Sequence, residues 1–411
     1  GERLGACTDC RRYWARHRAG EIDAREIGRV EGRLAVTAGT CAVMGTASTM
    51  ACIAEVLGFM PAGAATVPAV HADRLRVAEE TGLLAATRLV GSTLRPRDLV
   101  TAESLDNAVR VLLALSGSTN AVVHLAAIAG RAGLALDPDR LGRTSDETPV
   151  LLDLKPVGDG YMEDLHAAGG LPAVLAELAP LLHRDCPTVT GETIGARLDT
   201  PLVEKVDRRV VRARHDPVSP VGGLVALRGT LAPEGAILKR AAATPALLEH
   251  EGRAVVFASL EDLATRIDDP GLDVTADDVL VLQNAGPASA ASMPEAGYLP
   301  IPKKLAQAGV KDMVRISDAR MSGTAFGAVV LHVAPDAASG GPLALVRSGD
   351  RIRLSVAQRR LDLLVEAAEL ERRRRDLRPA VPRGSGYARL YHEHILQAPQ
   401  GCDFDLWRAA E

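Results

Sequence analysis

The fold of this chain is decided by the stretch Val314-Arg-Ile-Ser-Asp-Ala-Arg-Met-Ser-Gly-Thr-Ala-Phe-Gly327. Its first residues are typical of a buried strand, and the small residues after them predict a turn or a helix start. Backbone N–H groups at such a turn favour negative charge. Ser322 and Thr324 are therefore candidate catalytic hydroxyls, with the serine acting as an alkoxide base if a cation lies nearby. Ser-Gly-Thr is also ordinary turn chemistry, so the tripeptide alone leaves both interpretations open.

On both sides of this stretch the chain has the pattern of a β-rich region. From Gly222 onward, short apolar runs recur between Gly, Pro and Asp residues, which predicts strands and turns. The expected strands are Leu224–Arg228, Ala254–Phe257, Val279–Leu282, Met313–Ile316, Val329–Val333 and Arg351–Leu354. This spacing indicates a barrel or sandwich with helices packed outside it. A charged helix is expected over residues 365–375, and no clear periodicity follows from Pro379 onward.

The first half of the chain is mainly helical in its periodicity, with short apolar strands expected between the helices. The expected helices cover residues 46–58, 105–115, 119–131 and 169–182, and a short strand is expected over 150–154. Thr46 or Thr49 is expected to cap the first of these helices. A chain of 411 residues is long enough for two domains. We expect an α/β domain over residues 1–215 and a second domain over 216–411.

Composition excludes several classes of function. The net charge of −4 is too small to indicate binding to nucleic acid or to an acidic membrane surface, and aromatic residues at 3% are too few for base stacking. No apolar run reaches the roughly 20 residues that cross a bilayer, and no signal segment is present. We therefore expect a cytoplasmic protein. Its six scattered cysteines are typical of free thiols or metal ligands rather than of a disulfide framework.

Cysteines and one glutamate are the candidate metal ligands. Cys41 lies just before an expected helix, where the helix dipole would lower the pKa of the thiol and favour a metal or iron–sulfur ligand. Cys41 could equally be a small packed residue. Cys7 and Cys10 form a C-x-x-C pair, although no second pair follows at zinc-ribbon spacing. Glu295, in a loop rich in Gly, Pro and Ser, could bind a divalent cation or simply be solvated.

Other polar residues have weaker signals. Asp318 and Arg320 could pair beside Ser322, or form an ion pair that only fixes the turn. His392 and His394 would share a face in an extended segment, but no third metal ligand is evident. The arginines at 372–375 are most simply a solvated helix end.

Several motifs together resemble the dihydroxy-acid and sugar-acid dehydratase family, which includes phosphogluconate dehydratase. They run in family order over nearly the whole chain, and the pentonate (L-arabinonate/D-xylonate-type) dehydratases are the most similar branch. The motifs are Gly39-Thr-Cys-x-x-Met-Gly-Thr-Ala-Ser-Thr-Met50, Gly117-Ser-Thr-Asn120, Asp153-Leu-Lys-Pro156, Tyr161-Met-Glu-Asp164, Ala168-Gly-Gly170, Leu227-Arg-Gly-Thr-Leu-Ala-Pro-Glu-Gly235, Asn284-Ala-Gly-Pro287, Met293-Pro-Glu295, Arg315-Ile-Ser-Asp-Ala-Arg-Met-Ser-Gly-Thr324 and Gly401-Cys-Asp-Phe-Asp405.

The resemblance implies a fold, a reaction and cofactors. The implied α/β fold is a truncated α/β/α N-terminal domain followed by a β-barrel domain with flanking helices, in a homodimer or homotetramer. The implied reaction converts an aldonic acid to a 2-keto-3-deoxy acid. Ser322 would take the C2 proton and Thr324 would position the substrate. Glu295 would bind Mg²⁺, and Cys41 would bind a [2Fe–2S] cluster that acts as the Lewis acid for the 3-hydroxyl.

The family's other cluster cysteines and magnesium ligands belong upstream of the segment that starts this chain. We therefore expect the chain to be the C-terminal two-thirds or so of such an enzyme. Three alternatives remain: a non-catalytic descendant that serves as a binding or assembly subunit, a rewired metal site built from Cys7, Cys10 and Cys41, and a branched-chain dihydroxy-acid dehydratase, which is a weaker match.

Overall fold

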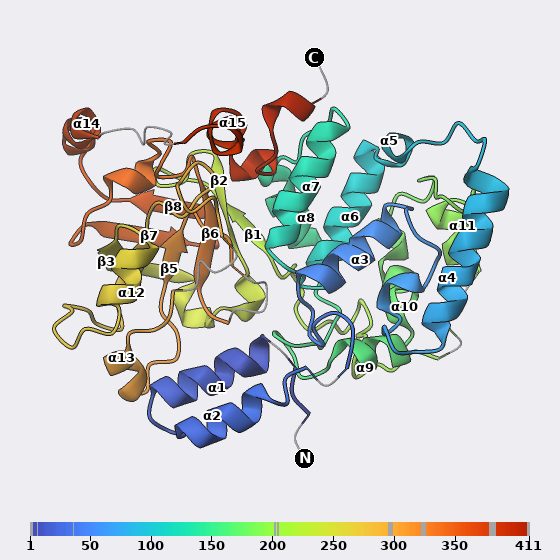
Figure 1. Ribbon diagram of the computed structural model, residues 1–411, viewed down its shortest axis with the longest axis horizontal. Coiled ribbons are helices and arrows are strands. Elements are labelled where there is room, and N and C mark those ends of the chain that lie inside the picture. Colours follow the sequence, from blue (N-terminus) through green and yellow to red (C-terminus); the bar gives the residue numbers. More distant parts are fainter. Residues whose placement is uncertain are drawn as a thin grey trace. The chain divides into compact units, whose positions relative to one another are not determined.

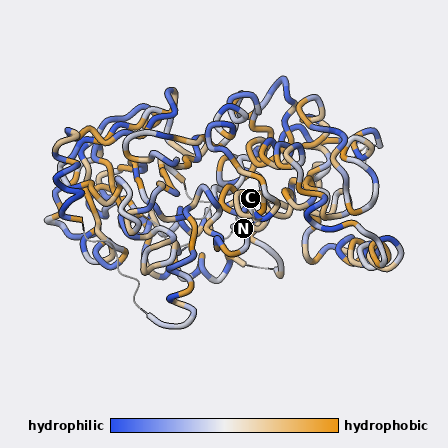
Figure 2. Tube along the Cα trace, turned by 90° about the horizontal axis from the view of Figure 1, so that it is seen from above, coloured by the Kyte–Doolittle hydropathy of each residue, from blue (hydrophilic) through white to orange (hydrophobic). Residues whose placement is uncertain are grey.

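The computed structural model describes residues 3–5, 7–35, 37–200, 203, 205–294, 299–321, 326–377 and 384–408. The chain forms two compact units. The first, called the helical unit, comprises Gly1–Arg11, Gly28–Ala121 and Arg143–Gly223, and the second, called the barrel unit, comprises Arg12–Ile27, Val122–Gly142 and Leu224–Glu411. In Figure 2, hydrophobic positions recur inside both units and hydrophilic stretches follow outer loops. Within the described ranges, no helix is both long and apolar enough to span a membrane.

Helices dominate the chain up to residue 199 (Figure 1). In order they are α1 Thr8–Arg18, α2 Ala24–Glu31, α3 Thr46–Val56, η1 Ala64–Thr66, α4 Asp73–Leu84, η2 Ala85–Leu89, α5 Pro96–Leu99, α6 Ala102–Ala114, α7 Asn120–Arg131, α8 Pro138–Glu147, α9 Met162–Ala167, α10 Gly170–Leu178, η3 Ala179–Leu181 and α11 Ile194–Asp199. The four expected helices are confirmed as α3, α6, α7, and α10 with η3. The other helices of this half, α1, α2, α4, α5, α8, α9 and α11, were not among the expected ones.

Helix α3 packs against α6 and buries the side chains of Cys52 and Ile53 in the core of the helical unit. The expected threonine cap of α3 was wrong, because Gly45 is the N-cap and no side chain caps the helix. The Thr49 hydroxyl instead donates to the Gly45 carbonyl at 2.7 Å, from one turn inside the helix.

The expected strand over residues 150–154 is reduced to isolated bridges. Val150 pairs with Ser219, Leu152 with Val211 and Leu154 with Gly160. These partners come from irregular segments rather than from another apolar run. The local pattern therefore predicted extended backbone correctly. A regular strand also needs a neighbouring strand to pair with, and the local sequence does not determine that.

The barrel unit contains an eight-stranded sheet in the order β1-β2-β6-β5-β4-β3-β7-β8. The strands are β1 Val225–Leu227, β2 Gly235–Leu238, β3 Glu249–Phe257, β4 Val279–Leu282, β5 Arg315–Ser317, β6 Val329–Ala334, β7 Arg351–Ser355 and β8 Arg360–Leu363. The central pairs from β3 to β6 are parallel, and the outer pairs are antiparallel. Arg228, just after β1, bridges to Arg360 in β8 and nearly closes the sheet into a barrel. The expected α/β fold with a barrel is confirmed.

Apolar side chains fill both faces of this sheet. One cluster, which includes Val281, Ile316 and Val330, forms the main core. A second cluster joins Phe257 to Leu263 and so packs α12, Leu260–Arg266, against β3. The helices α12, α13 Lys303–Gln307 and α14 Ala367–Asp376 lie around the strands (Figure 1). The remaining elements are α15 Tyr387–His394 and the short turns η4 Arg240–Ala242, η5 Pro245–Leu247, η6 Pro342–Leu345, η7 Ala398–Gln400 and η8 Asp405–Trp407.

A β-bulge interrupts the pairing of β2 with β6. Gly235 pairs with Ala334 and Ile237 with Leu331, so two residues of β6 oppose Ala236 alone. One of these two is His332, whose φ of 59° is left-handed. Bulges bend a strand and re-aim a side chain, so this one determines where the His332 ring lies.

Candidate functional site

Cys41 lies in the loop before α3, and its side chain is partly buried. A hydrogen bond with the Cys7 thiol and burial raise the pKa of Cys41, and these effects outweigh the backbone N–H groups of Val43 and Ala42, which lower it. The expected lowering of this pKa was therefore wrong for the chain without a metal. The structure does bring the Cys7 and Cys41 thiols together, which the sequence pattern could not show.

Two other family motifs flank the Cys41 loop. The backbone N–H of Met44 donates to the Lys155 carbonyl at 3.0 Å, and the N–H of Met162 donates to the Ala42 carbonyl at 2.8 Å. These two bonds join the loop to the Asp153–Pro156 and Tyr161–Asp164 segments. Residues more than 100 positions apart thus form one structural neighbourhood around the predicted cluster ligand.

A network of hydroxyl groups joins a third motif to the same loop. The Thr46 and Ser118 hydroxyls lie 2.8 Å apart, and the Asn120 side-chain amide donates to the Thr46 hydroxyl at 3.2 Å. The Thr49 hydroxyl accepts from the backbone N–H of Ser118 at 3.1 Å. A Cβ at Gly117 would lie only 2.7 Å from the Thr49 methyl group, so only glycine allows this close approach.

A buried ion pair lies beside this network. The Lys155 ammonium is 3.1 Å from the nearer carboxylate oxygen of Asp9, whose side chain is 1% exposed, and 2.5 Å from the Tyr161 hydroxyl. Burial acts to lower the pKa of Lys155, but the bonds to Tyr161 and Asp9 outweigh it and raise this pKa. The Lys155 cation therefore compensates the charge of the buried Asp9 carboxylate.

In the barrel unit, two buried aspartates hold the loop that leads toward Glu295. The two carboxylate oxygens of Asp318 accept from the backbone N–H groups of Ala285 at 3.0 Å and Ala337 at 2.9 Å. Asp336 accepts from the N–H of Ala288 at 2.7 Å. Burial, reinforced by the Asp336 charge, raises the pKa of Asp318 to about 7. The expected pairing of Asp318 with Arg320 was wrong, because backbone donors occupy the carboxylate.

Arg320 instead joins the two chain segments that lead to the predicted catalytic residues. Its Nε donates to the Met293 carbonyl at 2.9 Å. Arg320 stands two positions before Ser322, and Met293 stands two positions before Glu295. Ser322, Thr324 and Glu295 themselves lie outside the described residues, so their roles stay predictions.

Lys239 is a candidate residue that the sequence analysis missed. It follows β2 directly, is 5% exposed, and burial lowers its pKa to about 7. The same segment borders the chain that emerges from the β5–β6 loop, because the N–H of Gly327 donates to the Ala242 carbonyl at 2.8 Å. Nothing in the local sequence marks this lysine, since its burial depends on the surrounding barrel.

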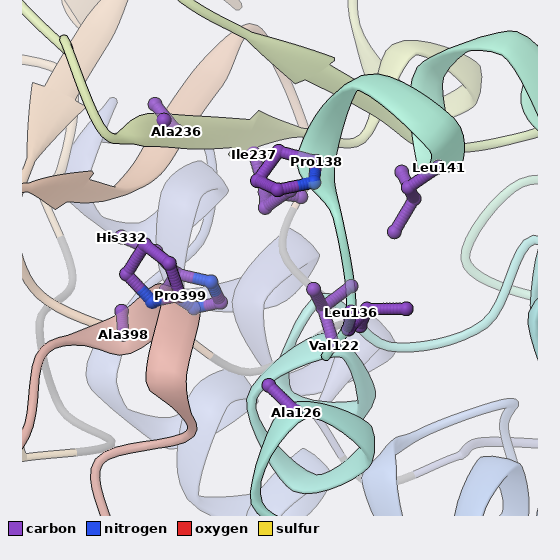
Figure 3. Close-up of a pocket in the computed structure, with 11 residues that line it drawn as sticks. Val122, Ala126, Leu136, Pro138, Leu141, Ala236, Ile237, His332, Ala398 and Pro399 are labelled. Carbon is purple, nitrogen blue, oxygen red and sulfur yellow. The ribbon is translucent and has the colours of Figure 1, made fainter. Parts of the chain in front are cut away.

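His332 is a second missed residue. It lines an apolar cavity of about 30 Å³ with residues of α7, α8, β2 and the chain near residue 399 (Figure 3). The ring is buried, and within the described part of the chain neither nitrogen has a hydrogen-bond partner. Burial, with the charges of Arg320 and His124, lowers the pKa of His332 to about 3. The ring is therefore a neutral imidazole with unused hydrogen-bonding capacity.

Two other sequence interpretations change. His392 and His394 lie in helix α15 rather than in an extended segment, and His394 pairs with Asp405 at 2.9 Å. Residues two apart on a helix do not share a face, so the expected alignment was wrong. Arg373, expected to be solvated, is 9% exposed and pairs with Asp350.

The described residues do not complete a site for an iron–sulfur cluster or for Mg²⁺. Cys41 and Cys7 are adjacent, and the Cys10 pKa is raised by burial and by the Cys7 thiol. In the part of the chain that the structure describes, however, only one group of three His, Cys, Asp or Glu residues has ligand atoms all within 4.8 Å of one another, and it contains no cysteine. A metal site built from Cys7, Cys10 and Cys41 is therefore not formed in this geometry.

Comparisons with known proteins agree with this arrangement of motifs. The dihydroxy-acid/6-phosphogluconate dehydratase N-terminal model matches residues 2–197, and the C-terminal model of the same family matches residues 209–402. A 6-deoxy-6-sulfo-D-gluconate dehydratase of Pseudomonas putida is 46% identical, over 100% of this chain and 71% of its own length. An L-arabonate dehydratase of Azospirillum brasilense is 45% identical over 99% and 71%. An L-arabinonate dehydratase of Rhizobium leguminosarum bv. trifolii is 43% identical over 99% and 70%. The chain belongs to the dihydroxy-acid/6-phosphogluconate dehydratase family.

Proposed function

We propose that the chain is a hydro-lyase that converts an aldonic acid, such as a pentonate or a 6-substituted gluconate, to a 2-keto-3-deoxy acid. The three relatives named above are dehydratases of sugar acids of this kind. The observation that carries the proposal is the hydrogen bond from Arg320 to Met293, because it joins the segments that enter Ser322 and Glu295.

In the proposed reaction, the alkoxide of Ser322 takes the proton from C2 of the substrate. The C3–O bond then breaks, and its electron pair leaves with the oxygen. The electron pair of the former C2–H bond forms the C2–C3 double bond, and the resulting enol tautomerises to the ketone. The net change is the loss of one water. Thr324 positions the substrate. Lys239 is a candidate for proton exchange in this reaction, because an amine with a pKa near 7 gains or loses its proton readily at neutral pH.

Glu295 is proposed as a Mg²⁺ ligand and Cys41 as a ligand of a [2Fe–2S] cluster. A bound cluster would supply Lewis acidity toward the departing hydroxyl. Neither site is complete within the described residues, so the steps assigned here are those of the chain's own groups. A homo-oligomeric state and the division into an α/β domain over 1–215 and a barrel domain over 216–411 also stay proposals.

The test is turnover of L-arabinonate, D-xylonate and 6-deoxy-6-sulfo-D-gluconate by the anaerobically purified chain, with 2-keto acid formation as the readout. The branched-chain alternative is tested in parallel with a 2,3-dihydroxy-3-methyl acid. Ser322→Ala is expected to lower kcat by at least about 100-fold, the usual scale for loss of a general base. Ser385→Ala is the matched control, because Ser385 is an exposed serine of the same unit.

A non-catalytic binding subunit is the second candidate. It predicts that the folded chain binds the sugar acids in a calorimeter without any turnover. Equal turnover by the wild-type chain and Ser322→Ala would overturn the assignment of the base.

A further inference from the structure

One group of side chains in the helical unit has the composition of a metal site and lies outside every motif that the proposed function uses. His71, Asp73 and His166 present ligand atoms that all lie within 4.8 Å of one another. His71 and Asp73 stand at the start of α4, and His166 stands in α9. Two imidazoles and one carboxylate are the donor set that zinc and other borderline divalent metals favour.

The distances within the group are close to those of a coordinated ion. Tetrahedral zinc with ligands at about 2.1 Å holds its donor atoms roughly 3.4 Å apart. His71 Nδ1 and Asp73 Oδ2 are already 3.3 Å apart, and the backbone N–H of Asp73, which donates to the same Nδ1 at 3.2 Å, would have to give up this bond to the ion. The His71 and His166 rings lie 5.1 Å apart between centroids and are steeply inclined at 72°. Small side-chain rotations would therefore bring all three donors onto one ion.

Positive charges near the group oppose the binding of a cation. Arg76 forms an ion pair with Asp73 and so competes with a cation for this carboxylate. The start of α4 also carries the positive end of the helix dipole. The two imidazole ligands have to outweigh this repulsion, and the affinity is therefore expected to be moderate.

We propose that His71, Asp73 and His166 bind one divalent transition-metal ion, Zn²⁺ or a similar ion, with open positions for water. The site is independent of the proposed dehydratase chemistry, because none of the three residues belongs to the predicted base, magnesium or cluster positions. It would link the start of α4 to α9 in the same way that a structural metal clips two helices.

The experiment is titration of the metal-free chain with Co²⁺, which substitutes for Zn²⁺ and reports its ligands by absorption. Histidine and carboxylate ligands give only weak visible bands, whereas thiolate ligands add intense near-ultraviolet bands, so binding at the cysteines is recognised separately. The wild-type chain is expected to show one equivalent with the visible bands alone, and Zn²⁺ is expected to displace it.

Variants decide which residues bind the ion. His71→Ala and His166→Ala are each expected to weaken binding at least about tenfold. Losing even a hydrogen-bond partner of a metal ligand commonly costs about this much affinity, and these variants remove a ligand itself. His71 is 47% exposed on its side chain, so its removal should leave the fold intact. Arg76→Ala is expected to tighten binding, because Asp73 loses its competing partner.

The matched control is His183→Ala. His183 and Asp106 form another His–Asp pair at the same 3.3 Å separation, also in the helical unit, and among the described residues they belong to no such group of three. This variant should bind Co²⁺ as the wild-type chain does. Unchanged binding in His71→Ala, or a spectrum made only of thiolate bands, would overturn the proposal. Because no substrate is present, a failure of the dehydratase assignment would leave these results unaffected.

Discussion

A buried aspartate of the helical unit and two buried groups of the barrel unit are accommodated in different ways. In the helical unit, the buried Asp9 carboxylate is paired with Lys155 and bonded to Tyr161, so the charges compensate one another. In the barrel unit, Asp318 and Lys239 are buried with pKa values shifted to about 7 in both cases, from opposite directions. Shifted pKa values are typical of groups that exchange protons during catalysis. The difference holds for these groups and not for the whole units, because Asp312 pairs with Arg315 in the barrel unit and burial raises the pKa of Glu55 in the helical unit.

The largest expected effect follows from breaking the ion pair of Lys155 and Asp9. Lys155→Met leaves the Asp9 carboxylate buried without its cation, and we expect a loss of about 3 kcal/mol in the free energy of unfolding. Urea denaturation measures this loss. The double variant with Asp9→Asn should recover part of it, because no buried charge then remains. Lys303→Met, at an exposed lysine, is the control and should change stability little. An equal loss in the single and double variants would contradict the interpretation of a compensated pair.

A smaller effect concerns Asp318 and pH. Its folded pKa of about 7 lies above the ordinary value of 3.8, so between these values the folded state holds a proton that the unfolded state has lost. Stability therefore falls as pH rises through this window, by about 2 to 3 kcal/mol between roughly pH 5 and pH 8. Asp318→Asn should have a lower free energy of unfolding at every pH, because the NH₂ group of its amide would face a backbone N–H donor. Its stability should lack the part of the pH dependence that comes from Asp318. Asp159→Asn, at an exposed aspartate, should keep the full slope.

The smallest effect concerns Lys239. Its folded pKa of about 7 lies below the ordinary 10.5, so the folded state binds fewer protons between these values and stability rises with pH there. Lys239→Met should remove this rise, which urea denaturation at pH 7 and at about pH 9 measures. The same variant should lose turnover. A variant that lacks the rise but keeps full activity would show that Lys239 takes no part in the chemistry.

Helical periodicity predicted α3, α6, α7 and α10. Short apolar runs between turn residues predicted six of the strands, of which β1, β4, β5 and β6 are buried throughout. The strand β2 was missed because it has only four residues and begins at the glycine of a Pro-Glu-Gly turn. The strand β8 was missed because it alternates charged with apolar residues. Pairing with β6 and β7 makes them strands, and that pairing depends on distant sequence.

The candidate site was predictable only in part. Cys41 was located by its motif, and the structure surrounds it with the other motifs of the helical unit. The burial of Asp318 and Lys239 could not be predicted, because a side chain's exposure depends on what packs over it rather than on its neighbours in the chain. His332 was missed for a further reason, since a bulge rather than regular alternation determines its direction.

The bridge between Arg228 and Arg360 has a consequence for solubility. An open sheet leaves unpaired backbone donors and acceptors along its outermost strands, where a second chain can add by hydrogen bonding and begin aggregation. Joining the first and last strands leaves little of that template. A partner that approaches the barrel must therefore recognise its side chains or its covering helices rather than extend its sheet.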